Sequence, residues 1–150
     1  MKVENLSYRQ LLNGWVMRLA NHLVNEEGIE RSRAMRIAHM TSWILEDLGK
    51  GVVHFTYKKG DGTFREALGT LCKGVCDEYD HSLDEYLANP QKHRQQSRDN
   101  SNTEGVYTYW DVIKNGFRTF KAKNLITMQW SANPDEFHNA LMSYAGDRTA

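Results

Sequence analysis

The chain has 150 residues, of which 40% are hydrophobic, and its 19 basic residues balance its 19 acidic residues. A chain of this length can bury one core, with room for a small helical extension beside it. Because the formal net charge is zero, there is no overall attraction to nucleic acid or to anionic membranes, and any nucleic-acid site must be a local concentration of cations. No apolar run approaches the roughly 20 residues of a membrane span, and the N-terminus lacks a signal-peptide pattern, so we expect a cytoplasmic protein without a membrane partner.

The first fifty residues have the pattern of two amphipathic helices. Ser7 is a suitable N-cap for the first, and Glu26-Glu27-Gly28 ends it. The second is expected from Glu30 to Leu48, with Gly49 as its stop. Apolar residues recur at three- and four-residue spacing in the first segment, namely Leu11, Leu12, Trp15, Leu19, Leu23 and Val24. The sequence therefore predicts a helical hairpin over residues 1–50.

Three arginines near the start of the second helix allow two interpretations of this hairpin. Arg31, Arg33 and Arg36 could contact DNA if the two helices formed a helix-turn-helix. We favour an amphipathic pair packed on the rest of the protein with its arginines solvated, because a helix-turn-helix usually needs a third packed helix.

Two aromatic hairpins follow, each with its own turn. Residues 52–57 alternate between two faces, Asp61-Gly62 supplies a tight turn, and residues 63–71 are expected to form the returning strand, with a bulge or sharp bend at Gly69. Residues 106–110 are β-branched and aromatic, Asn115-Gly116 makes a second turn, and residues 117–120 lead back. A fifth strand is expected over Asn124 to Trp130.

The pattern V-x-F-x-Y-K-K-x-D-G-T-x-R-E-A-x-G-T, followed by Y-x-Y-W-D and G-F-R-T-F-K-A-K-N-L-I, resembles the WYL-like (WYL_2) family of Sm-like SH3 β-barrel proteins of bacteria and phages. The resemblance runs from Gly51 to about Thr127, apart from an insertion. It implies a small five-stranded antiparallel barrel. It does not by itself assign a function, because a fold hosts many functions.

An insertion over residues 73–104 separates the two hairpins, and a short helix follows them. The first part of the insertion is acidic, and it includes a predicted helix over Ser82 to Ala88 and then a polar mobile loop. A closing helix begins at Asn133-Pro134 and lies within residues 131–150. The expected fold class is α+β, with a helical hairpin (1–50), an SH3-like barrel (51–130, with the insertion) and a C-terminal helix.

The local charge of the barrel is the best indication of function. Cations interleaved with aromatic rings are what a single-stranded nucleic-acid surface needs, because the cations bind phosphates and the rings stack with bases. The same aromatics could instead fill the core; if Tyr107, Tyr109 and Phe117 point inward, Trp110 faces out as the stacking candidate. The predicted nucleic-acid-binding residues are Lys58, Lys59, Arg65, Trp110, Lys114, Arg118, Lys121 and Lys123.

Catalysis, cofactors and metals are not expected. The chain has no Gly-rich phosphate loop, nucleophile elbow or metal-binding helix motif, and Cys72 and Cys76 lack a second ligand pair. His54 could meet Asp111 across the sheet, and Glu66 could meet Arg118, but such pairs are more often cross-strand contacts than catalytic sites.

The sequence therefore predicts a non-catalytic small-barrel binding module, a nucleic-acid-associated regulator of bacterial or phage origin whose expected partner is single-stranded nucleic acid. The alternative is a module for a protein partner or a small ligand, such as a phage-type inhibitor that binds a host complex through the acidic part of the insertion. In that case charge reversal at Asp84 and Glu85 would matter more than removal of the barrel cations.

Overall fold

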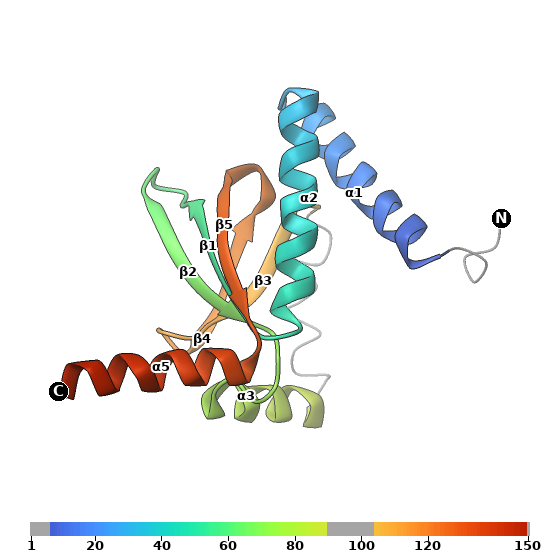
Figure 1. The fold of residues 1–150 in the computed structure, drawn as a ribbon. Helices are drawn as coiled ribbons and strands as arrows, with labels where there is room; N and C mark the ends of the chain where they lie inside the picture. Colours follow the sequence, from blue (N-terminus) through green and yellow to red (C-terminus); the bar gives the residue numbers. More distant parts are fainter. Residues whose placement is uncertain (1–6, 90–103, 150) are drawn as a thin grey trace.

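The computed structural model describes residues 7–89 and 104–149, and the side chains up to residue 143. Within these residues the chain forms four α-helices and one five-stranded antiparallel sheet. Figure 1 shows a pair of helices beside a strongly curved sheet and two more helices at its lower end. None of the described helices has an apolar stretch long enough to cross a membrane. The predicted α+β class is confirmed.

The predicted helical hairpin consists of α1 (Tyr8–Asn25) and α2 (Arg31–Leu48). Ser7 caps α1 as predicted, because its side chain accepts from the Gln10 backbone N–H while the Gln10 side chain accepts from the Ser7 N–H. Glu30 caps α2, because its carboxylate accepts hydrogen bonds from the backbone N–H groups of Ser32 and Arg33. The hydrogen bonds of the caps thus define where both helices begin.

The two helices pack on each other through small and aliphatic side chains, and α2 continues onto the sheet. Their shared cluster contains Val16, Leu19, Ala20, Leu23, Ala34, Ile37, Ala38 and, from the sheet side, Ala122. Farther along α2, Ile44 and Leu48 enter the core of the sheet. The three arginines at the start of α2 are all exposed, and Arg31 donates a hydrogen bond to Oδ1 of Asn21 of α1 over 2.7 Å.

The sheet has the strand order β4-β3-β2-β1-β5. Its elements are β1 (Val52–Lys58), β2 (Phe64–Thr70), β3 (Val106–Asp111), β4 (Gly116–Lys121), the short 3-10 helix η2 (Ala122–Asn124) and β5 (Leu125–Ala132). Both predicted turns are present, with Gly62 at φ +88° and Asn115 at φ +54°. The left-handed backbone of these residues explains the Gly and Asn in the two turns.

The sheet is not closed into a barrel, which corrects the prediction. β4 and β5 are its two edges and do not pair with each other. β2 pairs with all of β1 but meets β3 only at Gly69 and Thr70, so the β3–β4 hairpin diverges from the β1–β2 hairpin. At the other edge β5 pairs with β1 and packs beside α2. Figure 1 shows the resulting half-open curl.

The concave face of this sheet holds the main core. Its buried residues are Ile44, Leu48, Val53, Phe55, Tyr57, Ala67, Tyr109, Phe120 and Leu125. Gly69 sits in regular pairing with Val53, so of the bulge or sharp bend expected there the bulge is absent. Glycine is needed for another reason, since a Cβ at this position would lie 2.8 Å from Cδ2 of Tyr109. Gly69 thus allows Tyr109 to pack directly on the backbone of β2.

Two further helices lie against the convex face and the end of the sheet. α3 (Asp77–Ala88) begins five residues before the predicted start, and α5 (Pro134–Thr149) follows an N-cap at Asn133. Tyr79 of α3 is buried and packs on Trp110. The loop predicted to be mobile falls largely on residues 90–103, which lie outside the described residues.

Candidate anion-binding site

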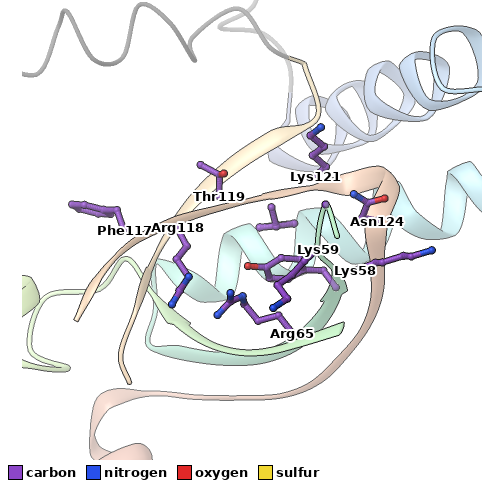
Figure 2. Close-up of a pocket in the computed structure, with 11 residues that line it drawn as sticks. Lys58, Lys59, Arg65, Phe117, Arg118, Thr119, Lys121 and Asn124 are labelled. Carbon is purple, nitrogen blue, oxygen red and sulfur yellow. The ribbon is translucent and has the colours of Figure 1, made fainter. Parts of the chain in front are cut away.

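A pocket of about 420 Å³ lies where the sheet fails to close. One wall is the end of the β1–β2 hairpin and the other is the free edge of β4 (Figure 2). We call it the seam pocket, and it is lined by Tyr57, Lys58, Lys59, Gly60 and Arg65, by residues 117–121 of β4, and by Asn124. The volume falls within the range of small-molecule sites.

The charge of the seam pocket has one sign. Its lining includes five cationic side chains and no carboxylate, and the five are Lys58, Lys59, Arg65, Arg118 and Lys121. Cations gathered on low-dielectric walls raise the local concentration of anions even when the whole chain is neutral. The pocket is therefore suited to an anionic ligand.

The two arginines lie on the concave face because of strand register. Arg65 is opposite Tyr57, and Arg118 is opposite Tyr109, so each arginine shares a face with a core tyrosine. Figure 2 shows their guanidinium ends directed toward one another from the two walls. Residues from strands that are not neighbours in the sheet thus converge on one point.

Arg118 is held in position by a buried carboxylate. Asp111, which is 5% exposed, accepts from Nε of Arg118 over 2.7 Å and from the backbone N–H groups of Ile113 and Lys114. Within the described structure only Nε contacts this carboxylate, so the two terminal nitrogens of Arg118 can donate to a ligand. Asp111 thus orients the guanidinium group and leaves its two terminal nitrogens available to a ligand.

Two core tyrosines of the concave face point their hydroxyl groups toward each other. The hydroxyls of Tyr57 and Tyr109 are 2.7 Å apart. Burial, and then the hydrogen bond with Tyr57, raise the pKa of Tyr109 above its usual value. Tyr109 therefore stays neutral near pH 7 and adds no negative charge beside the arginines.

The remaining three predicted residues lie elsewhere. Trp110 is 4% exposed beneath Tyr79, so the expectation that it faces out as a stacking ring is wrong. Lys114 is exposed in the β3–β4 turn, outside the seam pocket, and Lys123 forms an ion pair with Glu27 over 3.1 Å in a smaller neighbouring pocket.

Phe117 takes the place that Trp110 was expected to fill. It was predicted to point inward, but it is opposite Trp110 in the hairpin register and therefore shares the convex face. Its ring packs edge-on against Trp110 and is 52% exposed at the rim of the seam pocket. The turn at Asn115 sets this register, so counting residues back from the turn would have revealed the placement.

The two polar pairs considered from the sequence exchange partners in the structure. Asp111 pairs with Arg118 on the concave face, whereas His54 lies 3.9 Å from Glu66 on the convex face. Each pair consists of diagonal neighbours on adjacent strands, and alternation places the two pairs on opposite faces of the sheet. The predicted contacts of His54 with Asp111 and of Glu66 with Arg118 are therefore wrong.

No metal site is evident in the described part of the chain, where no three His, Cys, Asp or Glu side chains gather. Cys72 and Cys76 are both free thiols.

Comparison with known families assigns the chain to one of them. The model of the WYL_2 family, described as having an Sm-like SH3 β-barrel fold, matches residues 42–126, which is more than half of the chain. The chain belongs to this family, and its fold is that of a small binding module. The match begins within α2, includes the seam pocket and ends just after β5 begins. No curated protein and no solved structure matches the chain.

Proposed function

We propose that the protein is a non-catalytic module that binds single-stranded nucleic acid in the seam pocket. The observation that carries the proposal is the convergence of Arg65 and Arg118 in a pocket whose lining has cations but no carboxylate. Guanidinium groups bind phosphate through paired, charge-assisted hydrogen bonds. Phe117 lies on the opposite face of β4 from Arg118, so its exposed ring can stack with a base that crosses the free edge of this strand.

The side chains of the pocket support binding rather than catalysis. The lining includes arginine, lysine, tyrosine, threonine and asparagine, and among these described residues there is no histidine or carboxylate to serve as a general base. Phosphate binding without such a group positions a strand but does not hydrolyse it. Incubation of a labelled strand with the protein should therefore leave the strand intact.

The test is a titration of labelled single- and double-stranded DNA and RNA with the protein, followed by fluorescence anisotropy at several salt concentrations. We expect saturable binding of single strands that weakens as salt rises. The slope of log K against log salt should become shallower by about 0.7 for each phosphate that a variant no longer binds. Arg65→Gln and Arg118→Gln should each weaken binding and reduce this slope.

Matched controls come from cations that the sequence predicted but the structure places outside the pocket. Lys114→Gln and Lys123→Gln remove the same charge without changing the lining of the seam pocket. Equal weakening of binding in the controls and in the arginine variants would show non-specific attraction and contradict the proposal, as would the absence of binding at low salt.

A second candidate is a protein partner that binds α3. Asp84 and Glu85 are largely exposed although Asp84 pairs with Lys73 and Glu85 lies 3.4 Å from His81, and Leu87 is exposed nearby. An acidic surface with an exposed apolar side chain is a common feature of protein interfaces. If this surface is the functional one, reversal of charge at Asp84 and Glu85 should abolish partner binding, while Arg65→Gln should leave it intact.

A further inference from the structure

The positive charge of the seam pocket ends on the side that faces α1. Beyond Lys121, on the side of α1, the neighbouring pocket is lined by Glu27 and Glu104 as well as by Lys123. Glu27 pairs with Lys123, and Glu104 pairs with Arg18 over 3.4 Å, so the cations there are already matched by carboxylates. The basic surface therefore does not continue past the pocket in the direction of α1.

A strand that passed through the pocket would need a favourable surface in both directions. Proteins that bind internal segments of single strands use a basic groove that follows several successive phosphates. Here a strand leaving toward α1 would meet the carboxylates of Glu27 and Glu104. The arrangement therefore suits a ligand that ends inside the pocket.

The position of the arginines adds the second part of the argument. Arg65 and Arg118 reach one point from opposite walls, with Asp111 orienting the latter. A phosphate monoester has three terminal oxygens and close to two negative charges, whereas a phosphodiester has two such oxygens and one charge. Two guanidinium groups facing each other can use the additional oxygen and charge.

We infer that the seam pocket binds the terminal nucleotide of a single strand through its phosphate monoester, with Arg65 and Arg118 as the anchoring residues. This inference rests on the proposed function and specifies which part of the strand is recognised. A free nucleoside monophosphate has the same chemistry as a strand end, and the experiment separates these two sources.

The experiment compares four forms of one short oligonucleotide, each labelled on an internal base. The first has a 5′-phosphate, the second a 3′-phosphate, the third hydroxyls at both ends, and the fourth is closed into a circle by an ordinary phosphodiester. We expect one of the phosphorylated forms to bind about tenfold or more tightly than the hydroxyl-ended and circular forms. An excess of nucleoside monophosphate should compete only weakly if the strand end is the ligand, and as well as the strand if the free nucleotide is.

Two further readouts connect the preference to the pocket. Arg65→Gln should abolish the difference between phosphorylated and hydroxyl-ended strands, whereas Lys114→Gln should preserve it. The preference should also decrease as pH falls through about 6, where a phosphate monoester gains a proton and a phosphodiester does not. No histidine is among the described residues that line the pocket.

The outcomes distinguish this inference from the proposed function. If the circle binds as tightly as the phosphorylated strands and Arg65→Gln weakens both equally, single-strand binding stands and the end preference is overturned. If none of the four forms binds, both are overturned.

Discussion

The two ends of the concave face of the sheet have opposite chemistry although the same strands build both. At one end Val53 faces Gly69 and α2 covers the pair with Leu48. At the other end Tyr57 faces Arg65, and the seam pocket opens instead of a helix packing there. The comparison shows that one end of the concave face stabilises the fold, whereas the other end, where the sheet stays open, leaves space for a ligand.

The largest effect is expected from a truncation at the apolar end. Phe55→Ala should lower the free energy of unfolding by about 3–5 kcal/mol, because the buried ring contacts Tyr57, Tyr109 and Phe120 and its removal leaves a cavity. Urea unfolding followed by circular dichroism measures the change. Phe64→Ala, on an adjacent strand but 66% exposed, is the control and should cost far less; similar destabilisation in the two variants would contradict the assignment of the core.

A smaller effect is expected from overpacking at the same end. Gly69→Ala should destabilise by about 1–3 kcal/mol, because its Cβ would lie 2.8 Å from Cδ2 of Tyr109 and 3.2 Å from Cδ2 of Leu48. Gly60→Ala adds the same methyl group in open space and is the matched control. Thermal unfolding of both variants tests the contact, and a Gly69→Ala protein as stable as the control would show that Tyr109 does not pack on β2.

Between the two ends, Tyr107 links the sheet to α1 and gives a test by pH. Burial, and then the nearby Glu104, raise the pKa of Tyr107 from 10.0 to about 12. The unfolded chain, in which the pKa of Tyr107 is 10.0, ionises before the folded protein does, so the contribution of Tyr107 to stability is fully present below about pH 10 and is lost as pH rises to about 12. Ionisation of the unfolded chain favours unfolding, so stability falls over this interval.

The measurement is urea unfolding at a series of alkaline pH values. Tyr107→Phe should show a shallower decline of stability over this interval than the wild-type protein. Parallel curves for the two proteins would place the alkaline sensitivity in other groups.

The smallest effect on stability is expected at the charged end. Arg65→Gln should change the free energy of unfolding by no more than about 0.5 kcal/mol, because the arginine is partly exposed and no ion pair holds it within the described structure. Removing one of five neighbouring cations also relieves repulsion. A pronounced destabilisation in urea would show that Arg65 supports the fold, and the contrast between the two ends would fail.

Much of the local structure followed from short-range signals. The Ser7 cap, the Asn115 turn and the alternation in β1 each depend on neighbours a few residues away, so they could be predicted and are present. The helix of the insertion was also expected, but its start was placed too late because acidic residues 77–80 have the composition of a loop as well as that of a first helical turn.

The errors at the candidate site have one physical origin. Trp110 faces the convex side of its strand, and it is buried because Tyr79, about thirty positions earlier, covers it. Phe117 remains exposed at the rim because that cover is partial. Alternation indicates the face of a sheet that a residue occupies, but it does not indicate what packs on that face.

The amino-acid sequence by itself determined the helices, the two hairpins, the family and the local excess of cations, because each depends on residues close together in the chain. Only the tertiary structure decided that five of those cations line one pocket and that Trp110 is covered. It also decided that the sheet stays open between β4 and β5. These outcomes depend on how distant segments pack, since the divergence of two hairpins and the position of α2 are set by side-chain volumes that no local pattern records.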